Sequence, residues 1–219
     1  MILFLADNHY NAFSGKNIHG EIENDYAIDF SEDDFAKLAD INSGKYQLLM
    51  LHMIAGTCNN DHPDQASQDA LKAYLGKGGN MLLHHGSSAA FWEWDWWRKI
   101  VGHRWVRRDD PDGSEQSTHP VEPYSVSLCN AIHPLAKKLL PMDFDTDEIY
   151  INLEQTAPTI DLMETYYDKK RYVQAWSCPT PWGGEIIGLL PGHAPSATSN
   201  PQFLANLKTI INYLYKKLM

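Results

Sequence analysis

Histidines end or closely follow three short apolar segments of this chain. His9 comes after Ile2–Ala6, His84 and His85 come at the end of the run from Asn80, and His193 comes after Glu185–Leu190. Neutral imidazole accepts a proton near pH 7 and binds divalent metals, so these residues suit proton transfer or metal coordination. If the segments are parallel strands, their carboxyl ends meet at the edge where open α/β sheets bind ligands. The positions therefore predict an imidazole site at that edge; the alternative is that these histidines are satisfied or solvated individually.

The segment from Leu83 to Ala90 carries the sharpest local pattern. Its sequence, LHHGSSAA, leads from an apolar strand through His85 into a run of small residues. This resembles a nucleophile elbow, in which a strand turns sharply into a helix and small residues are required. A histidine stands at the elbow, however, and Gly-x-Ser-x-Gly is absent. Ser87 is therefore expected to cap the helix and leave room for a ligand, as a substrate-binding residue. The alternatives are a nucleophilic serine at this turn or a reactive Cys58.

Four of the seven tryptophans lie directly after this segment, between positions 92 and 97. On a helix, Trp92 and Trp96 share a face, whereas Trp94 and Trp97 point elsewhere, so one packed face cannot bury all four. Packing in the core accounts for some of them. Aromatic rings also provide flat apolar area for stacking on a sugar, and Trp92 and Trp94, nearest to His85, are the candidates for that role.

The elements that must position these residues alternate along the chain. Short apolar runs suited to strands buried on both faces are Ile2–Ala6, Gln47–Ile54, Asn80–His84 and Glu185–Leu190. Helical periodicity covers 66–75 and 201–218, and a further helix is expected to start at a capping box formed by Ser31 and Asp34. Strand–helix–strand alternation predicts an α/β fold with a mostly parallel sheet. Residues 120–178 lack a crossover helix and are rich in Tyr, Val and Thr, which predicts added antiparallel strands.

Composition excludes several classes of protein. The chain has 219 residues, 18 basic and 28 acidic side chains and a formal net charge of −10. Nucleic-acid binding and docking on an anionic membrane both need clustered Lys and Arg, so neither is expected. The N-terminus lacks the basic region of a signal peptide, and no apolar run is long enough to span a membrane. With three scattered cysteines, the expectation is a cytoplasmic protein with reduced thiols, forming one domain over residues 1–219.

Several short motifs, in order, resemble the ThuA-like (trehalose utilisation) family. They are the stretch 82–106 with LLHHGSSAAFWEWDWWRKIVGHRWV, Thr118-His119-Pro120, His133-Pro134-Leu135, DFDTDEIY at 143–150 and GLLPGH at 188–193. The resemblance covers about 45–215 and departs at 8–30, which are too polar for the usual first helix. It implies a flavodoxin-like, class I glutamine-amidotransferase-like three-layer sandwich. His85 falls where the amidotransferases carry their catalytic Cys, so glutaminase activity is not expected.

The resemblance also implies a function, because genes of this family are associated with disaccharide use through 3-keto sugars. A 3-keto group acidifies the proton on the neighbouring sugar carbon, so a base can remove it and the glycosidic oxygen can then leave. The expected activity is therefore proton abstraction with elimination or hydrolysis of a keto disaccharide or glycoside. The alternatives are a non-catalytic sugar- or partner-binding module that has lost the Cys, and a serine- or metal-dependent hydrolase of another small substrate.

The strand positions and the resemblance to the family together imply roles for individual residues. The expected catalytic residues are His85, His119, Glu148 and His193, and the expected substrate-binding residues are Trp92, Trp94, Ser87 and Asp147. A divalent metal such as zinc, held by His9, His85 and His193, is a further possibility that rests on the strand map and the resemblance. No nucleotide cofactor is expected, and the expected partner is a small carbohydrate.

Overall fold

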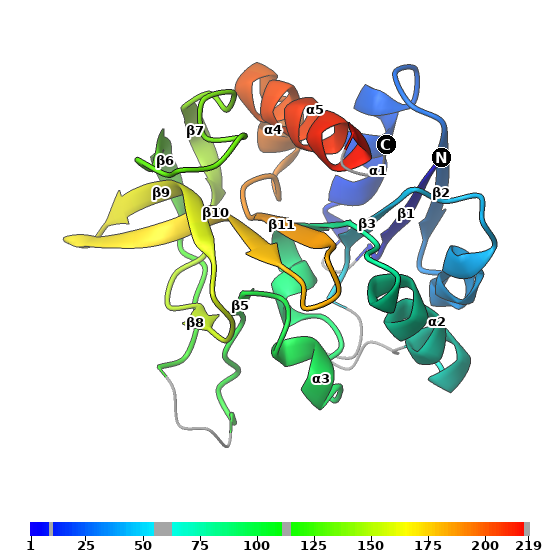
Figure 1. The fold of residues 1–219 in the computed structure, drawn as a ribbon. Helices are drawn as coiled ribbons and strands as arrows, with labels where there is room; N and C mark the ends of the chain where they lie inside the picture. Colours follow the sequence, from blue (N-terminus) through cyan, green and yellow to red (C-terminus); the bar gives the residue numbers. More distant parts are fainter. Residues whose placement is uncertain (9–10, 55–62, 111–114, 217–219) are drawn as a thin grey trace.

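The computed structural model describes residues 1–8, 11–54, 63–110 and 115–216. A nine-stranded sheet forms its centre, in the order β2-β1-β3-β4-β11-β10-β9-β6-β7 (Figure 1). Its strands are β1 (Ile2–Ala6), β2 (Ile28–Glu32), β3 (Leu48–His52), β4 (Met81–His84), β6 (Val121–Leu128), β7 (Met142–Glu148), β9 (Ile160–Tyr167), β10 (Lys170–Pro179) and β11 (Glu185–Leu189). A separate pair consists of β5 (His103–Arg104) and β8 (Glu154–Gln155).

The sheet has a parallel part and an antiparallel part. The neighbours among β2, β1, β3, β4 and β11 all pair in parallel, in the 2-1-3-4-5 order typical of flavodoxin-like folds. From β11 onward, β10, β9, β6 and β7 pair antiparallel. The predicted α/β sheet and its antiparallel addition around 120–178 are both confirmed.

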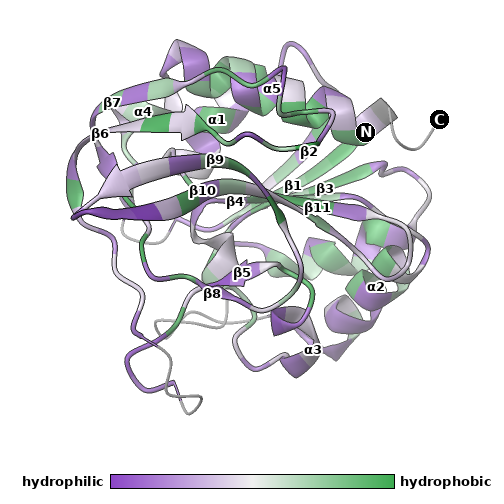
Figure 2. Ribbon diagram, turned by 60° about the vertical axis from the view of Figure 1, so that its left-hand side comes forward, coloured by the Kyte–Doolittle hydropathy of each residue, from purple (hydrophilic) through white to green (hydrophobic). Residues whose placement is uncertain are grey.

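Helices cover both faces of the parallel part and complete a three-layer sandwich (Figure 2). The helical segments are α1 (Ser14–Ile22), η2 (Phe35–Asn42), α2 (Gln65–Gly76), η3 (His85–Ala89), α3 (Asp95–Arg98), α4 (Pro195–Thr198) and α5 (Pro201–Lys216). Each face of the sheet has its own hydrophobic core. Ile2 and Phe4 of β1 pack with α1 and α5 in one core, and Leu3 and Leu5 pack with η2 and α2 in the other, because successive side chains of a strand point to opposite faces. Every residue of β1 is fully buried, as expected for a strand covered on both faces.

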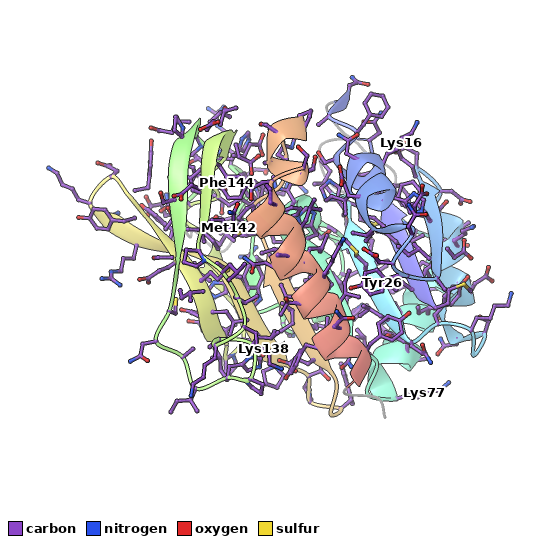
Figure 3. All side chains as sticks on the ribbon, turned by 90° about the horizontal axis from the view of Figure 1, so that it is seen from above. Lys16, Tyr26, Lys77, Lys138, Met142 and Phe144 are labelled. Atoms are coloured by element: carbon purple, nitrogen blue, oxygen red, sulfur yellow. The ribbon has the colours of Figure 1, made fainter. Side chains whose placement is uncertain are left out.

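The long helix α5 ties the two parts of the sheet together. Seen from above, it lies across the sheet between β7, marked by Met142 and Phe144, and the α1 side, marked by Tyr26 (Figure 3). Its apolar side belongs to the same core as Met142 and Phe144, and the hydroxyl of Tyr26 donates to the Lys208 carbonyl at 3.3 Å. Burial of this stripe explains the helical period from Phe203 to Leu214.

Two local predictions are wrong. Ser31 does not cap a helix, because it lies within β2; the next helical segment, η2, is instead capped by Asp34, whose side chain accepts a hydrogen bond from the Ala36 N–H. In the tryptophan segment only the four residues of α3 are helical, so helical spacing does not relate Trp92 to Trp96. The stretch 8–30, expected to be too polar for the first helix of the family, contains α1 and the start of β2, so that expectation is wrong: four residues of α1 are buried and supply its apolar side. In the described ranges, no helix has the length and apolar character needed to cross a membrane.

Candidate functional site

A cavity opens where the parallel strands end, at the edge predicted from the histidine positions. It is lined by Asp7, Ser14, His52, Met53, Ile54, His85, Gly86, Ala89, Trp105, His119, Glu148, Tyr150 and His193. Asp7 follows β1, His52 ends β3 and His85 follows β4. The antiparallel part supplies the opposite wall, because Glu148 ends β7.

Glu148 is the centre of the cavity's polar cluster. Its Oε2 lies 3.3 Å from His85 Nε2, and its Oε1 lies 3.3 Å from His119 Nδ1 and 3.6 Å from His193 Nε2. The four residues expected to be catalytic therefore meet at one carboxylate, although they lie on four separate segments of the chain. Their roles in a reaction remain predictions.

His85 is held in a strained turn with a defined tautomer. Its φ of 50° is in the left-handed region, which a residue with a Cβ adopts only at a cost that the surrounding structure must offset. Its Nδ1 lies 2.8 Å from the Leu190 carbonyl, which accepts hydrogen bonds only, so Nδ1 carries the proton and the neutral ring keeps a lone pair on Nε2. That atom also lies 3.3 Å from the Tyr150 hydroxyl. A Cβ at Gly86 would lie 2.4 Å from Ile54, which explains the small residue after the turn.

Burial and mutual contact set the charges of this cluster. Burial alone would raise the pKa of Glu148, but the hydrogen bond from His119 and the attraction of the adjoining His85 when that ring is protonated outweigh it and hold that pKa well below its usual range. The hydrogen bond to Glu148 raises the pKa of His119, in spite of partial burial. Burial and the neighbouring His85 lower the pKa of His193. Glu148 is therefore anionic, His119 is readily protonated and His193 is neutral. The cluster thus contains an imidazole that can donate a proton and another that can accept one.

Asp147 does not line the cavity, and its prediction as a substrate-binding residue is not supported. It is 1% exposed, and its carboxylate accepts the backbone N–H groups of Gly192 at 2.7 Å, His193 at 3.0 Å and Ala194 at 2.9 Å. Gly192 has a φ of 115°, a conformation that favours glycine. Asp147 therefore holds the turn that carries His193 into the site.

The structure also corrects three other substrate-binding predictions. Ser87 is fully buried, and its hydroxyl accepts the Met53 N–H at 3.0 Å instead of facing the cavity. Trp94 is buried in the core and stacks on Phe91 at 4.2 Å between ring centroids. Trp92 lies away from the cavity lining, with the guanidinium groups of Arg98, Arg104 and Arg107 over its ring at 5.4, 5.4 and 4.6 Å. His9 lies outside the described residues.

Trp105, Tyr150 and His52 are among the cavity residues that the sequence analysis missed. Trp105 contacts Tyr150 edge-on, with ring centroids 5.0 Å apart, and it is the tryptophan that lines the cavity. Tyr150 ends the DFDTDEIY motif two residues after Glu148, which was a usable signal. His52 ends the strand β3, so the strand-end rule applied to the other histidines would have found it.

The same cluster has the form of a metal site. Ligand atoms of His85, Glu148 and His193 all lie within 4.8 Å of one another. Around a tetrahedral zinc ion, ligands at about 2.0–2.2 Å lie about 3.3–3.6 Å apart, close to the 3.3 Å separating His85 Nε2 from Glu148 Oε2. His85 also donates its other N–H to a backbone carbonyl, the usual support of a ligating imidazole. These three residues therefore fit a divalent cation.

Fold and site together define a flavodoxin-like α/β protein with an imidazole–carboxylate cluster at the carboxyl edge of its sheet. The family model for ThuA, described as trehalose utilisation, matches residues 8–214, and the chain belongs to this family. That membership relates it to carbohydrate use. The comparison with curated proteins gave no match.

Solved structures with the same fold include two ThuA-like proteins. One from Parabacteroides merdae is 17% identical with a TM-score of 0.78, covering 98% of this chain and 88% of that one. One from Bacteroides uniformis is 15% identical with a TM-score of 0.71, covering 97% and 89%. The β-galactosidase of Bacillus circulans sp. alkalophilus is 8% identical with a TM-score of 0.60, covering 99% of this chain and 31% of that protein. At these identities the likeness shows the fold.

Replacing Asp147 with Asn is expected to lower the free energy of unfolding by about 2–4 kcal/mol, because the amide offers one oxygen and turns its NH2 toward N–H donors. Urea denaturation measures this change. Asp145→Asn is the matched control, since Asp145 is exposed on the same strand and should change stability by less than about 0.5 kcal/mol. Equal effects of the two substitutions would contradict the role given to Asp147.

Proposed function

We propose that this protein is an enzyme that cleaves an oxidised, 3-keto glycoside or disaccharide by proton abstraction and elimination. The observation that carries the proposal is the meeting of three imidazoles at Glu148 inside a cavity that also presents Trp105. Membership of a family described by trehalose utilisation supports a carbohydrate as substrate.

His85 is the proposed base. Its Nε2 lone pair takes the proton from the carbon between the keto carbon and the anomeric carbon, and the C–H electrons form the enolate. Glu148, 3.3 Å from Nε2, stabilises the imidazolium that results. The Tyr150 hydroxyl, 3.3 Å from the same nitrogen, is placed to donate to the enolate oxygen.

His119 is the proposed acid. Its pKa is raised by the hydrogen bond to Glu148, so it holds a proton near neutral pH. Its side chain is 44% exposed, which places it at the cavity mouth, where a leaving sugar would lie. As the enolate collapses, the bond from the anomeric carbon to the glycosidic oxygen breaks, and His119 gives its proton to that oxygen. The products are the free alcohol and an unsaturated keto sugar, so atoms and charge balance.

A second candidate, metal-assisted action on the same carbohydrate class, is favoured by the spacing of His85, Glu148 and His193. A divalent cation there would polarise a keto oxygen and stabilise its enolate. In that case His85, Glu148 and His193 would hold the cation, and His119 would be the imidazole outside the ligand set.

Substituting His85 with Gln should lower kcat/KM for methyl 3-keto-glucoside at least about 100-fold, because an amide cannot accept the proton. Steady-state kinetics measure the loss, and thermal unfolding verifies that the fold is retained. His103→Gln is the matched control, since His103 is also buried but lies outside the cavity lining. Full activity in His85→Gln would contradict the proposal, and sugar binding without turnover by the wild type would favour a non-catalytic module.

His119→Gln should slow substrates with poor leaving groups far more than those with good ones. An alkoxide must be protonated as it leaves, whereas p-nitrophenolate departs without help. Comparison of methyl and p-nitrophenyl 3-keto-glucosides measures the difference, with about 10–100-fold expected between them. The same rate loss for both glycosides would show that His119 is not the acid.

Treatment with EDTA distinguishes the two candidates. Proton transfer by the imidazoles alone predicts that dialysed protein keeps its activity and holds no stoichiometric divalent metal by elemental analysis. Loss of activity on chelation and recovery with Zn²⁺ would overturn that mechanism in favour of the metal site. Glu148→Gln would then lower the bound metal content as well as the activity.

A further inference from the structure

His52 belongs to a buried chain of hydrogen bonds that the proposed mechanism does not use. Its Nδ1 lies 2.6 Å from His84 Nδ1, and His84 Nε2 lies 2.8 Å from the Pro191 carbonyl oxygen. His84 is fully buried and His52 is 6% exposed. The chain runs from the β11–α4 segment, through the end of β4, to the end of β3.

The backbone end of the chain determines the tautomer of both rings. The Pro191 carbonyl only accepts, so His84 Nε2 carries a proton. His84 is fully buried and its two ring nitrogens face an imidazole and a carbonyl, with no carboxylate as partner, so the neutral ring donates from Nε2 and accepts at Nδ1. His52 must then donate from Nδ1, which leaves the lone pair of a neutral His52 on Nε2.

That lone pair belongs to a ring that lines the cavity. Within the described part of the chain, nothing hydrogen-bonds His52 Nε2. The His52 ring stacks on His85 with centroids 5.7 Å apart and planes 15° apart, so the two imidazoles lie side by side. The group that could hold a metal ion comprises His85, Glu148 and His193 and does not include His52.

Neighbouring groups keep His52 neutral. The His52 ring is 6% exposed, and the rings stacked on it are the imidazoles of His84 and His85, which offer no negative charge to an imidazolium. Asp7, which also lines the cavity, already accepts the Ile54 N–H at 2.7 Å. A neutral ring with a fixed acceptor binds an O–H or N–H donor, and it suits a hydroxyl-rich ligand.

We propose that His52 Nε2 accepts a hydrogen bond from one hydroxyl of the bound sugar, and that His84 is a positioning residue that holds the His52 tautomer. This inference rests on the proposed carbohydrate function and adds a specificity-determining contact beside the base. A buried acceptor of this kind discriminates strongly against a ligand that lacks the matching hydroxyl, because the acceptor is then desolvated without a partner.

The tautomer is tested without any sugar. Two-bond ¹⁵N–¹H correlation spectra of histidine-labelled protein distinguish a ring protonated on Nδ1 from one protonated on Nε2, and His52→Gln assigns the signal. The expected result is a neutral His52 with its proton on Nδ1. His84→Asn retains an acceptor near Nδ1 and should keep that tautomer, whereas His84→Leu should lose it. A His52 protonated on Nε2 in the wild type would overturn the inference.

The contact is tested with methyl 3-keto-glucoside and its monodeoxy analogues. In the wild type, removal of one particular hydroxyl should lower kcat/KM about 10-fold or more, mainly through KM. His52→Leu should abolish this discrimination, and His52→Gln, which retains an acceptor, should restore part of it. If the wild type turns over the keto glycoside but His52→Leu discriminates equally, the inference fails and the proposed function stands. Absence of both turnover and binding in the wild type would overturn both.

Discussion

The site depends on one buried carboxylate and the turn that it holds. Asp147 accepts three successive backbone N–H groups from Gly192 to Ala194, a charge-assisted arrangement that fixes the turn after β11. The adjacent carbonyls of Leu190 and Pro191 then accept from His85 and His84, and so determine which nitrogen of each ring carries a proton. Ser14 donates to the His193 carbonyl at 2.6 Å and closes the turn against α1. The backbone of this turn thus determines the ring proton that His84 and His85 each donate to it.

This arrangement explains why the antiparallel addition is part of the site. The parallel core alone brings His52, His85 and His193 to one edge, whereas Glu148, the carboxylate that contacts the imidazoles, comes from β7. Strand β7 ends there with Asp147 and Glu148, two adjacent residues whose carboxylates contact different partners. Asp147 binds the backbone of the turn, and Glu148 contacts three imidazoles. Successive residues of a strand point to opposite sides, so one strand end can provide both functions.

Sequence patterns predicted the parts of the structure that follow from local composition. Apolar runs located four of the five parallel strands, because strands buried on both faces need continuous apolarity, and their ends located His85 and His193. Glu148 and His119 came from the resemblance alone, since a contact between distant segments leaves no local pattern. Trp94 and Asp147 were misplaced for the same reason: burial in a core and acceptance of distant N–H groups are tertiary properties.

The charges of the cavity support the proposal of a neutral ligand over a phosphorylated one. Among its described lining residues there is no Lys or Arg, whereas Asp7 and Glu148 are both present. A phosphate needs cationic or backbone N–H partners, and the N–H groups of the nearest turn are already taken by Asp147. The pKa of Glu148 is lowered and that of His119 is raised, so the negative charge of Glu148 is balanced by a protonated His119. His52 and His84, whose pKa values are lowered, remain neutral. Together with the aromatic ring of Trp105, such a surface offers hydrogen-bond acceptors and apolar area without net positive charge, which are the features that an uncharged sugar requires.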